Sequence, residues 1–207
     1  MVIETHDLLK ISHDDIFSHS PIPHWAVQSL EKAPYVVVRR VHAPKGQVAI
    51  GIRGKERNER FGAFLPVDCV QKQIKPEHLK ERNQWKNKLA PVFLTMEFAE
   101  KILEGYGFSW GPGGSAGFEL ASAVETVTSK SDLDIIIRAP KLVPVNLAIE
   151  IVKKFKKCPV KVDLQVETTA GGFSLLEYAR DAGPVLLKTI FGPKLSSNPW
   201  AETKISV

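Results

Sequence analysis

The chain has 207 residues, enough for one large domain or two small ones. Its apolar and charged fractions are ordinary for a globular protein, and no apolar run approaches the roughly 20 residues of a membrane helix, so a membrane-spanning protein is excluded. The net charge of +5 favours anionic partners such as phosphorylated ligands, nucleic acid or an acidic protein, although a solvated lysine-rich surface gives the same total.

The N-terminal segment and the cysteines indicate the compartment. The opening MVIETHDLLK is mixed and acidic and does not have the pattern of a signal peptide. Cys69 and Cys158 are too few for a disulfide scaffold or a zinc site, so we interpret them as ordinary thiols in a reducing environment. We therefore expect a cytoplasmic protein.

The first half of the chain alternates short apolar runs with turns. Residues 35–38 (YVVV) and 47–53 (QVAIGIR) are β-rich, and the APKG between them is a turn cluster, which predicts a hairpin. Residues 54–83 are polar and charged, with a few apolar anchors. The stretch from Lys75 to Lys88 predicts an exposed helix followed by a connector.

The second half has a clearer alternation of helix and strand. Thr95 is placed to cap a helix that ends near Gly105 and Gly107. A strand at 108–110, a helix from Ser115, a strand at 132–138, a helix from Pro144 to about 157 and a strand at 159–167 follow. Ser174 with Glu177 forms the pattern of a capping box, and Phe173 with Tyr178 that of a hydrophobic staple, so a last helix starts there.

These elements predict an α+β fold in two parts. A small N-terminal α+β unit over residues 1–88 precedes a mixed sheet flanked by helices over residues 89–207. The boundary is placed within several residues of position 88.

A pair of carboxylates lies on the predicted strand at 132–138. Side chains at i and i+2 on a strand point to one face, so Asp132 and Asp134 project together, about 7 Å apart along the backbone. Two carboxylates this close repel each other, and Mg²⁺ typically binds one or two carboxylates together with substrate phosphates. The alternative without a metal is that Asp132 caps a turn and Asp134 is a solvated strand residue.

Two neighbouring features favour the metal interpretation. Gly113-Gly114-Ser115 lies between a strand and a helix start, where backbone N–H groups bind phosphate, although Gly-Gly-Ser is also a common flexible turn. Asp163 shares a face of its alternating strand with Lys161 and Gln165. If that strand pairs with the Asp132 strand, three carboxylates meet; two would hold metals and the third would help to activate a hydroxyl nucleophile.

Arginines in the first third are candidate phosphate ligands. If the stretch is helical, Arg53, Arg57 and Arg60 lie on one face and could bind phosphates bidentately; a solvated charged face is the alternative. Lys161 and Gln165 could line the same cleft as Asp163. The Gly171-Gly172 loop is either a phosphate contact or a plain turn. The six histidines show no metal-binding spacing, so none is assigned a role.

The segments GGSAGFELAS, SDLDIII and KVDLQVET together resemble the core of the polymerase-β-like nucleotidyltransferases, which have a Gly-Ser, an Asp-x-Asp and a third Asp in this order. The gap between Ser115 and Asp132 is longer than is usual there. Over nearly the whole chain, VVVRR, VAIGIRGKERNERFGAFL, WGPGGSAGFELAS and VLLKTIFGPKL resemble the malonate decarboxylase holo-acyl-carrier-protein synthase family. Ala123 stands where that resemblance leads us to expect glycine.

The resemblance implies an enzyme, a phosphoribosyl-dephospho-coenzyme A transferase. The implied substrate is 2′-(5″-triphosphoribosyl)-3′-dephospho-coenzyme A, and the acceptor is a serine of the acyl-carrier subunit of malonate decarboxylase. Pyrophosphate would be released. The resemblance further implies two Mg²⁺ ions, bound by Asp132, Asp134 and Asp163. Gly114 and Ser115 would hold the leaving phosphates.

Two other classes of function remain open from sequence. A nucleotidyltransferase that uses ordinary nucleoside triphosphates on a small molecule, tRNA or protein would share the same core. A non-enzymatic binding module would be expected to lack the carboxylates, and all three are present. Nucleic-acid binding is the weakest alternative, because the aromatic residues do not interleave with a basic stripe.

Overall fold

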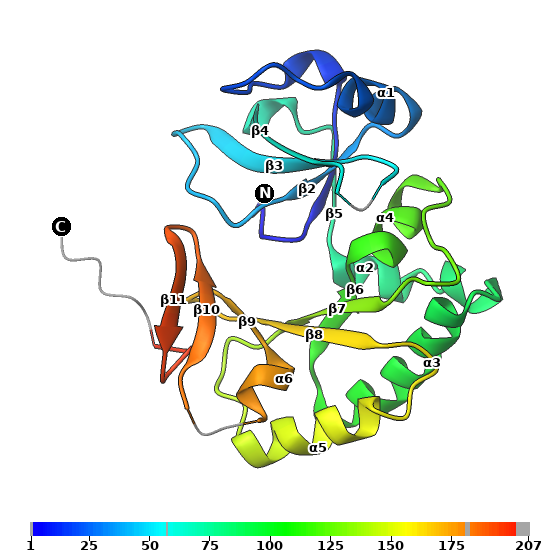
Figure 1. Cartoon of the computed structure of the whole chain (residues 1–207), viewed down its shortest axis with the longest axis vertical. Helices are drawn as coiled ribbons and strands as arrows, with labels where there is room; N and C mark the ends of the chain where they lie inside the picture. The colour runs from blue at the N-terminus through cyan, green and yellow to red at the C-terminus, as the bar shows by residue number, and fades with distance from the viewer. Residues whose placement is uncertain (1, 57, 181–182, 202–207) are drawn as a thin grey trace.

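The computed structural model describes residues 2–56, 58–180 and 183–201. It has two units stacked along the long axis of the molecule, each built on its own sheet (Figure 1). The upper unit is antiparallel and the lower one is mixed and flanked by helices. This arrangement confirms the predicted α+β fold. None of the helices in the described ranges is long and apolar enough to cross a membrane.

The N-terminal sheet has the strand order β4-β3-β2-β1-β5. The strands are β1 (Leu8–Lys10), β2 (Tyr35–Val38), β3 (Gln47–Arg53), β4 (Arg60–Pro66) and β5 (Lys72–Ile74). Helix α1 (His24–Lys32) buries Ala26 and Leu30 in the core of this unit. The short 3-10 helices η1 (His13–Asp15) and η2 (Val67–Cys69) complete it. The predicted hairpin of residues 35–38 and 47–53 is confirmed by the antiparallel pairing of β2 with β3.

The stretch after β3 is a second hairpin rather than a helix. Strand β4 returns along the whole of β3, with Arg53 opposite Arg60 and Ile52 opposite Phe61. The helical arrangement considered for Arg53–Arg60 is therefore wrong. Alternating apolar residues in β4 pack into the core below α1, and this tertiary packing outweighs the helix propensity of the charged residues between the strands.

The connection between the units is more buried than its composition predicts. It contains α2 (Pro76–Glu81) and η3 (Gln84–Asn87), in which Leu79 and Trp85 are fully buried. Helix α2 packs on strand β6 (Ser109–Pro112), where a Cβ atom on Gly111 would overlap the Pro76 carbonyl. The expectation of an exposed helix is thus wrong, because the helix is short and its single apolar face covers the second sheet.

The second sheet has the order β11-β10-β9-β8-β7-β6, and only β7 and β8 are parallel to each other. The strands after β6 are β7 (Leu133–Arg138), β8 (Val162–Glu167), β9 (Gly172–Ser174), β10 (Val185–Thr189) and β11 (Gly192–Ser196). The helices are α3 (Pro91–Leu103), η4 (Glu104–Tyr106), α4 (Gly114–Ser122), α5 (Val145–Phe155) and α6 (Leu175–Tyr178). Helices α3 and α5 lie below the sheet, away from the N-terminal unit (Figure 1).

The predicted helices and strands from α3 to α6 are present in the predicted order, but the short strand β9 lies between β8 and α6, where no strand is predicted, and helix starts differ. Helix α3 begins at Pro91, and the Thr95 hydroxyl inside it donates to the Pro91 carbonyl, so Thr95 is not a cap. Ser174 is the N-cap of α6 but makes no side-chain cap bond, and the Glu177 carboxylate accepts from the Leu186 N–H of β10 instead of completing the capping box. The staple contact is present, with the rings of Phe173 and Tyr178 5.5 Å apart.

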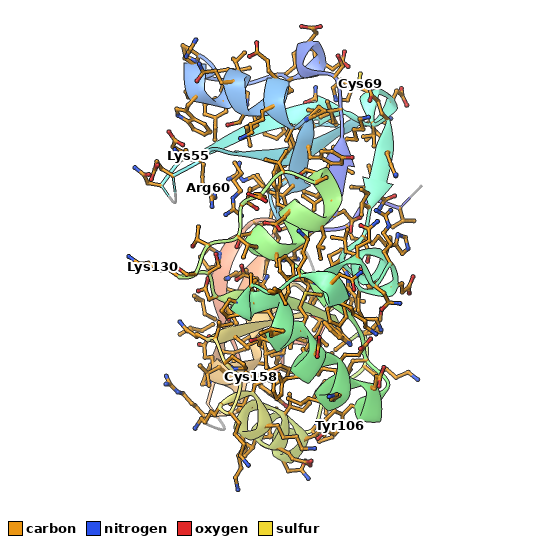
Figure 2. The ribbon with its side chains drawn as sticks, turned by 90° about the vertical axis from the view of Figure 1, so that its right-hand side faces the viewer. Lys55, Arg60, Cys69, Tyr106, Lys130 and Cys158 are labelled. Atoms are coloured by element: carbon orange, nitrogen blue, oxygen red, sulfur yellow. The ribbon has the colours of Figure 1, made fainter. Side chains whose placement is uncertain are left out.

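The two cysteines lie in different units. Cys69 is in the N-terminal unit, and Cys158 follows α5 in the lower unit (Figure 2). Both thiols are free, as the sequence interpretation expects.

Candidate active site

The loop between β6 and α4 holds a carboxylate at the start of the helix. The Gly113 N–H donates to the Asp134 carbonyl over 2.9 Å. Gly114 has a φ of +52°, and a Cβ atom there would overlap the Asp134 carboxylate. Glycine is required at this position both for the backbone conformation and for the close approach of Asp134. Ser115, in the first turn, is buried.

The three predicted aspartates come together across the parallel strands. Asp134 of β7 is the register partner of Asp163 of β8, and Asp132 lies just before β7. Leu133, Ile135 and Ile137 point into the core on the opposite face, as the alternation predicts. The sequence could place these carboxylates because strand alternation is local, whereas the β7–β8 pairing was an assumption that the structure supports.

Burial is the main cause of a raised pKa at Asp134. Burial, followed by the negative charges of Asp132 and Asp163, raises the pKa of Asp134 from 3.8 to about 6, while Arg53 and His6 oppose the shift. A buried carboxylate beside two others is destabilised in its charged form. A cation bound at this position would relieve that repulsion.

The carboxylates fit a hard divalent cation whose remaining ligands come from the substrate and water. Among the residues described by the structure, no group of three or more His, Cys, Asp or Glu side chains is already arranged to hold a metal ion. Mg²⁺ does not need such a cage, because it usually takes one or two carboxylates together with phosphate oxygens and water. Asp134 with either neighbour supplies that number.

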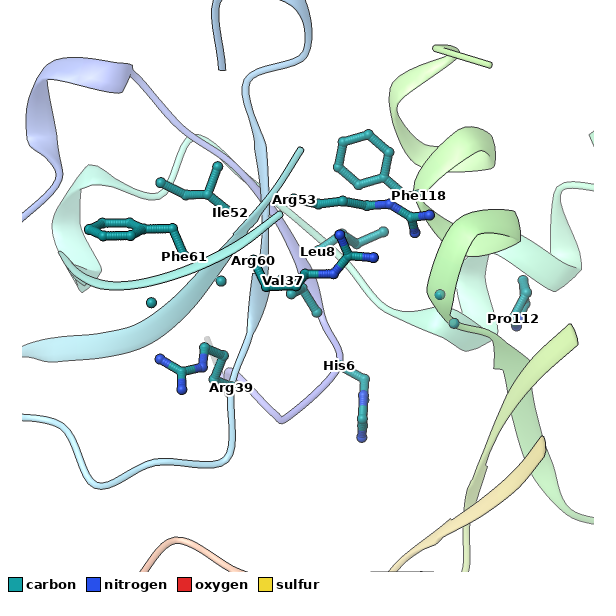
Figure 3. A pocket seen from close by; sticks show the side chains of 14 residues that line it. His6, Leu8, Val37, Arg39, Ile52, Arg53, Arg60, Phe61, Pro112 and Phe118 are labelled. Carbon is teal, nitrogen blue, oxygen red and sulfur yellow. The ribbon is translucent and has the colours of Figure 1, made fainter. Parts of the chain in front are cut away.

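Two of the three predicted arginines face the glycine loop. Arg53 and Arg60 are opposite each other on the β3–β4 hairpin and line a cavity of about 380 Å³ together with Gly113 and Gly114 (Figure 3). Burial, and then the charge of Arg60, lowers the pKa of Arg53, whereas Asp134 opposes this. The two arginines converge because they are paired across strands. Arg57 lies outside the described residues.

The predicted face of β8 is only partly in this cleft. Gln165 lies two residues beyond Asp163 and approaches His6 Nε2 to 2.9 Å. Lys161 is exposed and lines a separate hollow beside α5, because the strand begins only at Val162 and the alternation does not extend back to residue 161. The expectation that Lys161 shares the cleft is therefore wrong. Gly172 is part of strand β9, so the Gly171-Gly172 segment is not an open phosphate loop.

Several cleft residues were missed by sequence reasoning. His6, in a turn before β1 with a φ of 74°, lines the cavity and lies 3.0 Å from Glu167 Oε1. Glu167 is buried and also pairs with Arg40. Burial alone would raise the pKa of Glu167, but His6, Arg40 and Gln165 together lower it to about 2. The one sequence clue is that Glu167 shares a face of β8 with Asp163 and Gln165.

The long segment between Ser115 and Asp132 is a folded loop held by Glu119. This buried carboxylate on α4 pairs with Lys88 over 2.7 Å and accepts the N–H groups of Thr126 and Val127 over 2.9 Å each. The loop lines a second cavity of about 480 Å³, which shares Arg53 and Phe118 with the first. The insertion thus widens the site on the side of Lys32 and Lys55.

The cleft combines a glycine-rich helix start, clustered carboxylates and convergent arginines. Such a set positions and neutralises phosphate groups, with little covalent chemistry required from the protein. The fold and the site thus define the class of the chain as a transferase of phosphorylated groups.

Comparison with known proteins gives the particular family. The sequence pattern described as "Phosphoribosyl-dephospho-CoA transferase MdcG N-terminal domain" matches residues 4–76, and that of the "MdcG C-terminal domain" matches residues 79–199. The chain therefore belongs to the phosphoribosyl-dephospho-CoA transferase family.

Full-length relatives support this assignment. The phosphoribosyl-dephospho-CoA transferase of Pseudomonas fluorescens is 37% identical over 92% of this chain and 94% of its own. The enzyme of Pseudomonas aeruginosa is 36% identical over 95% of this chain and 93% of its own length. The enzyme of Azotobacter vinelandii is 34% identical over 96% of this chain and 95% of its own length. No solved structure matches the chain.

Proposed function

We propose that this protein transfers the 2′-(5″-triphosphoribosyl)-3′-dephospho-coenzyme A prosthetic group to a serine of the acyl-carrier subunit of malonate decarboxylase. The observation that carries the proposal is Asp134, held against the glycine-rich start of α4 beside two further carboxylates, in a protein of this family. Two unpaired cysteines support a reducing, cytoplasmic location.

In the proposed reaction the serine oxygen attacks the α-phosphorus of the triphosphate. A phosphodiester bond forms, the bond to the β-phosphate breaks, and pyrophosphate leaves. Asp163 is the most exposed of the three aspartates, so it is the one placed to take the serine proton. Asp134 is too enclosed by Gly114 for that role.

Metal ions complete the site in this proposal. Asp132, Asp134 and Asp163 would hold two Mg²⁺ ions, which would neutralise charge on the attacking and leaving oxygens. The backbone N–H groups at Gly113, Gly114 and Ser115 would bind the β- and γ-phosphates at the positive end of α4. Arg53 faces the same loop and adds charge opposite the leaving group.

The N-terminal part contributes the far wall of the cleft. Residues 1–88 would form the domain that binds the coenzyme substrate and the carrier, and residues 89–207 the catalytic domain. Arg53 and Arg60 support this division of labour, because both reach from the N-terminal sheet towards α4 (Figure 3).

Pyrophosphate release tests the choice of donor. The protein, Mg²⁺ and the apo acyl-carrier subunit are incubated with the triphosphoribosyl derivative, ATP or CTP in separate reactions. The proposal predicts carrier-dependent pyrophosphate release from the coenzyme derivative alone. Release from ATP or CTP, with none from the derivative, would make the protein a nucleotidyltransferase of ordinary nucleoside triphosphates instead.

A further inference from the structure

Two glycines face each other in the middle of the β3–β4 hairpin. Gly51 and Gly62 are register partners, two residues along from the Arg53–Arg60 pair and therefore on the same face of the sheet. Both line the cavity that also contains Gly113 and Gly114. Glycine weakens a strand interior, and paired glycines on a ligand-facing surface are typical of a close approach by another group.

The Arg39 side chain lies across this glycine pair. A Cβ atom on Gly62 would overlap Arg39 Nη1, and one on Gly51 would come within 3.2 Å of Arg39 Cδ. Arg39 follows β2 and is exposed, and within the described ranges its guanidinium has no ion-pair partner. The glycine pair therefore supports a flat guanidinium, whose outer face is open to the cleft.

The surroundings of Arg39 differ from those of the other cleft arginines. Val37 lies beside Gly51 and, with Leu8, makes this part of the cavity wall apolar. Arg39 and Pro112, which precedes the glycine loop, lie on opposite sides of the pocket (Figure 3). Arg53, by contrast, is close enough to Asp134 for their charges to interact.

We propose that Arg39 and the Gly51–Gly62 pair form a stacking platform for the adenine ring of the dephospho-coenzyme A moiety. An arginine plane stacks on a heterocycle, and an apolar wall beside it favours a base over a phosphate. This inference rests on the proposed function, which requires the cleft to hold adenosine as well as triphosphate. The triphosphate lies at Gly113 and Gly114, and the adenine lies across the cavity from it.

Calorimetric titration with two probes tests the platform. The probes are 3′-dephospho-coenzyme A, which has adenine but no triphosphate, and Mg²⁺-tripolyphosphate, which has no base. Arg39→Ala should weaken binding of dephospho-coenzyme A about tenfold, as expected for loss of one stacked base, and leave that of tripolyphosphate unchanged. Arg39→Lys should show most of the same loss, because it keeps the charge but not the plane.

Gly62→Ala tests the glycine support of the platform, since the added methyl group displaces the Arg39 guanidinium. It should also weaken dephospho-coenzyme A binding selectively. Gly105→Ala, where a Cβ meets no atom within 4 Å, and Arg82→Ala, an exposed arginine on the connector, are matched controls that should bind like wild type. If Gly62→Ala fails to fold, the two Arg39 variants decide the question.

Three results would overturn the platform. One is unchanged dephospho-coenzyme A affinity in both Arg39 variants, and another is an equal loss for tripolyphosphate, which would make Arg39 a phosphate ligand. The third is no binding of dephospho-coenzyme A by wild type. Prosthetic-group transfer by wild type is measured in parallel: if it succeeds, only the platform is refuted, and if it fails, the proposed function is refuted with it.

Discussion

At the scale of single residues, the site contains a carboxylate, Asp134, whose negative charge destabilises the folded protein. Asp134 is enclosed by the Gly114 backbone and flanked by two carboxylates, and its pKa of about 6 lies above the ordinary 3.8. A raised carboxyl pKa means that the folded state binds the proton more tightly than the unfolded chain does. The ionised Asp134 carboxylate therefore destabilises the metal-free fold. This effect has its full size above pH 6 and disappears below pH 3.8.

Asp134→Asn should consequently stabilise the metal-free protein while removing transfer. At pH 7.5 we expect a gain on the order of 2 kcal/mol in the free energy of unfolding, shrinking to nothing near pH 4. Denaturant titration across this pH range measures the gain. Glu31→Gln, at an exposed carboxylate of α1, is the matched control and should change little.

Magnesium separates this account from a purely structural effect. Mg²⁺ should raise the melting temperature of wild type and not that of Asp134→Asn, because a ligand stabilises only the form that binds it. Equal stabilisation of both proteins would contradict the assignment of Asp134 as a metal ligand.

The residue scale also shows what sequence can predict. The aspartates and glycines of the site follow from local patterns, because alternation along a strand and a glycine-rich helix start need only neighbouring residues. His6 could not be predicted, since its partner Glu167 is 161 positions away and only the packing of the two units joins them. The position of Arg39 in the site could not be predicted either, because its glycine support depends on the β3–β4 register.

At the scale of elements, helix α4 and the loop after it shape the site. The helix ends at Ser122, and its C-cap Ala123 has a φ of 61° in the left-handed region that favours glycine. The expectation of glycine at this position thus has a physical reason. An L-residue in this conformation costs about 1–2 kcal/mol.

Ala123→Gly should therefore stabilise the protein by about 1 kcal/mol without loss of transfer. Ala121→Gly, two residues earlier inside the same helix, is the matched control and should destabilise by a similar amount. Thermal unfolding of the two variants gives the comparison. If position 123 behaves like position 121, the helix does not end as described.

The loop of residues 123–131 depends on Glu119. Replacing this buried carboxylate by glutamine leaves the N–H groups of Thr126 and Val127 only an uncharged acceptor oxygen, turns an NH₂ group towards Lys88 and removes the ion pair. We expect a loss of about 2 kcal/mol in stability and faster hydrogen exchange at those two amides. Glu104→Gln, at an exposed carboxylate of η4, should leave both amides protected.

Elements were predicted best where one periodicity dominated. Strands β7 and β8 and helix α5 have clear alternation or an apolar stripe, and their existence was predicted correctly. Strand β4 was missed because its turn is highly charged, and the β10–β11 hairpin because its pairing along the sheet edge leaves much of β11 exposed. In both cases the partner strand, and not the local sequence, determines the structure.

At the scale of the whole molecule, ion pairs join the two units around the cleft. Arg138 at the end of β7 binds Asp7, which is fully buried before β1, and Glu77 of α2. His6 and Arg40 of the N-terminal unit hold Glu167 of β8. The cleft walls are therefore fixed by charges that one unit supplies to the other.

Acid should weaken this connection. The pKa of Glu167 is about 2 in the folded protein against an ordinary 4.5, so its stabilisation is complete above pH 4.5 and is lost as the pH falls towards 2. The loss is on the order of 3 kcal/mol. Glu167→Gln should lower stability at pH 7 and flatten the acid limb of the profile, whereas Glu81→Gln, at an exposed carboxylate of α2, should leave the profile unchanged.

In this proposal the Asp134 site attaches one particular nucleotide to a carrier-protein serine. Its most direct test is the intact mass of the apo acyl-carrier subunit after incubation with the protein, Mg²⁺ and the triphosphoribosyl derivative. We expect a gain of one phosphoribosyl-dephospho-coenzyme A group with wild type and none with Asp134→Asn. An unmodified carrier with wild type, or an equal gain with the variant, would contradict it.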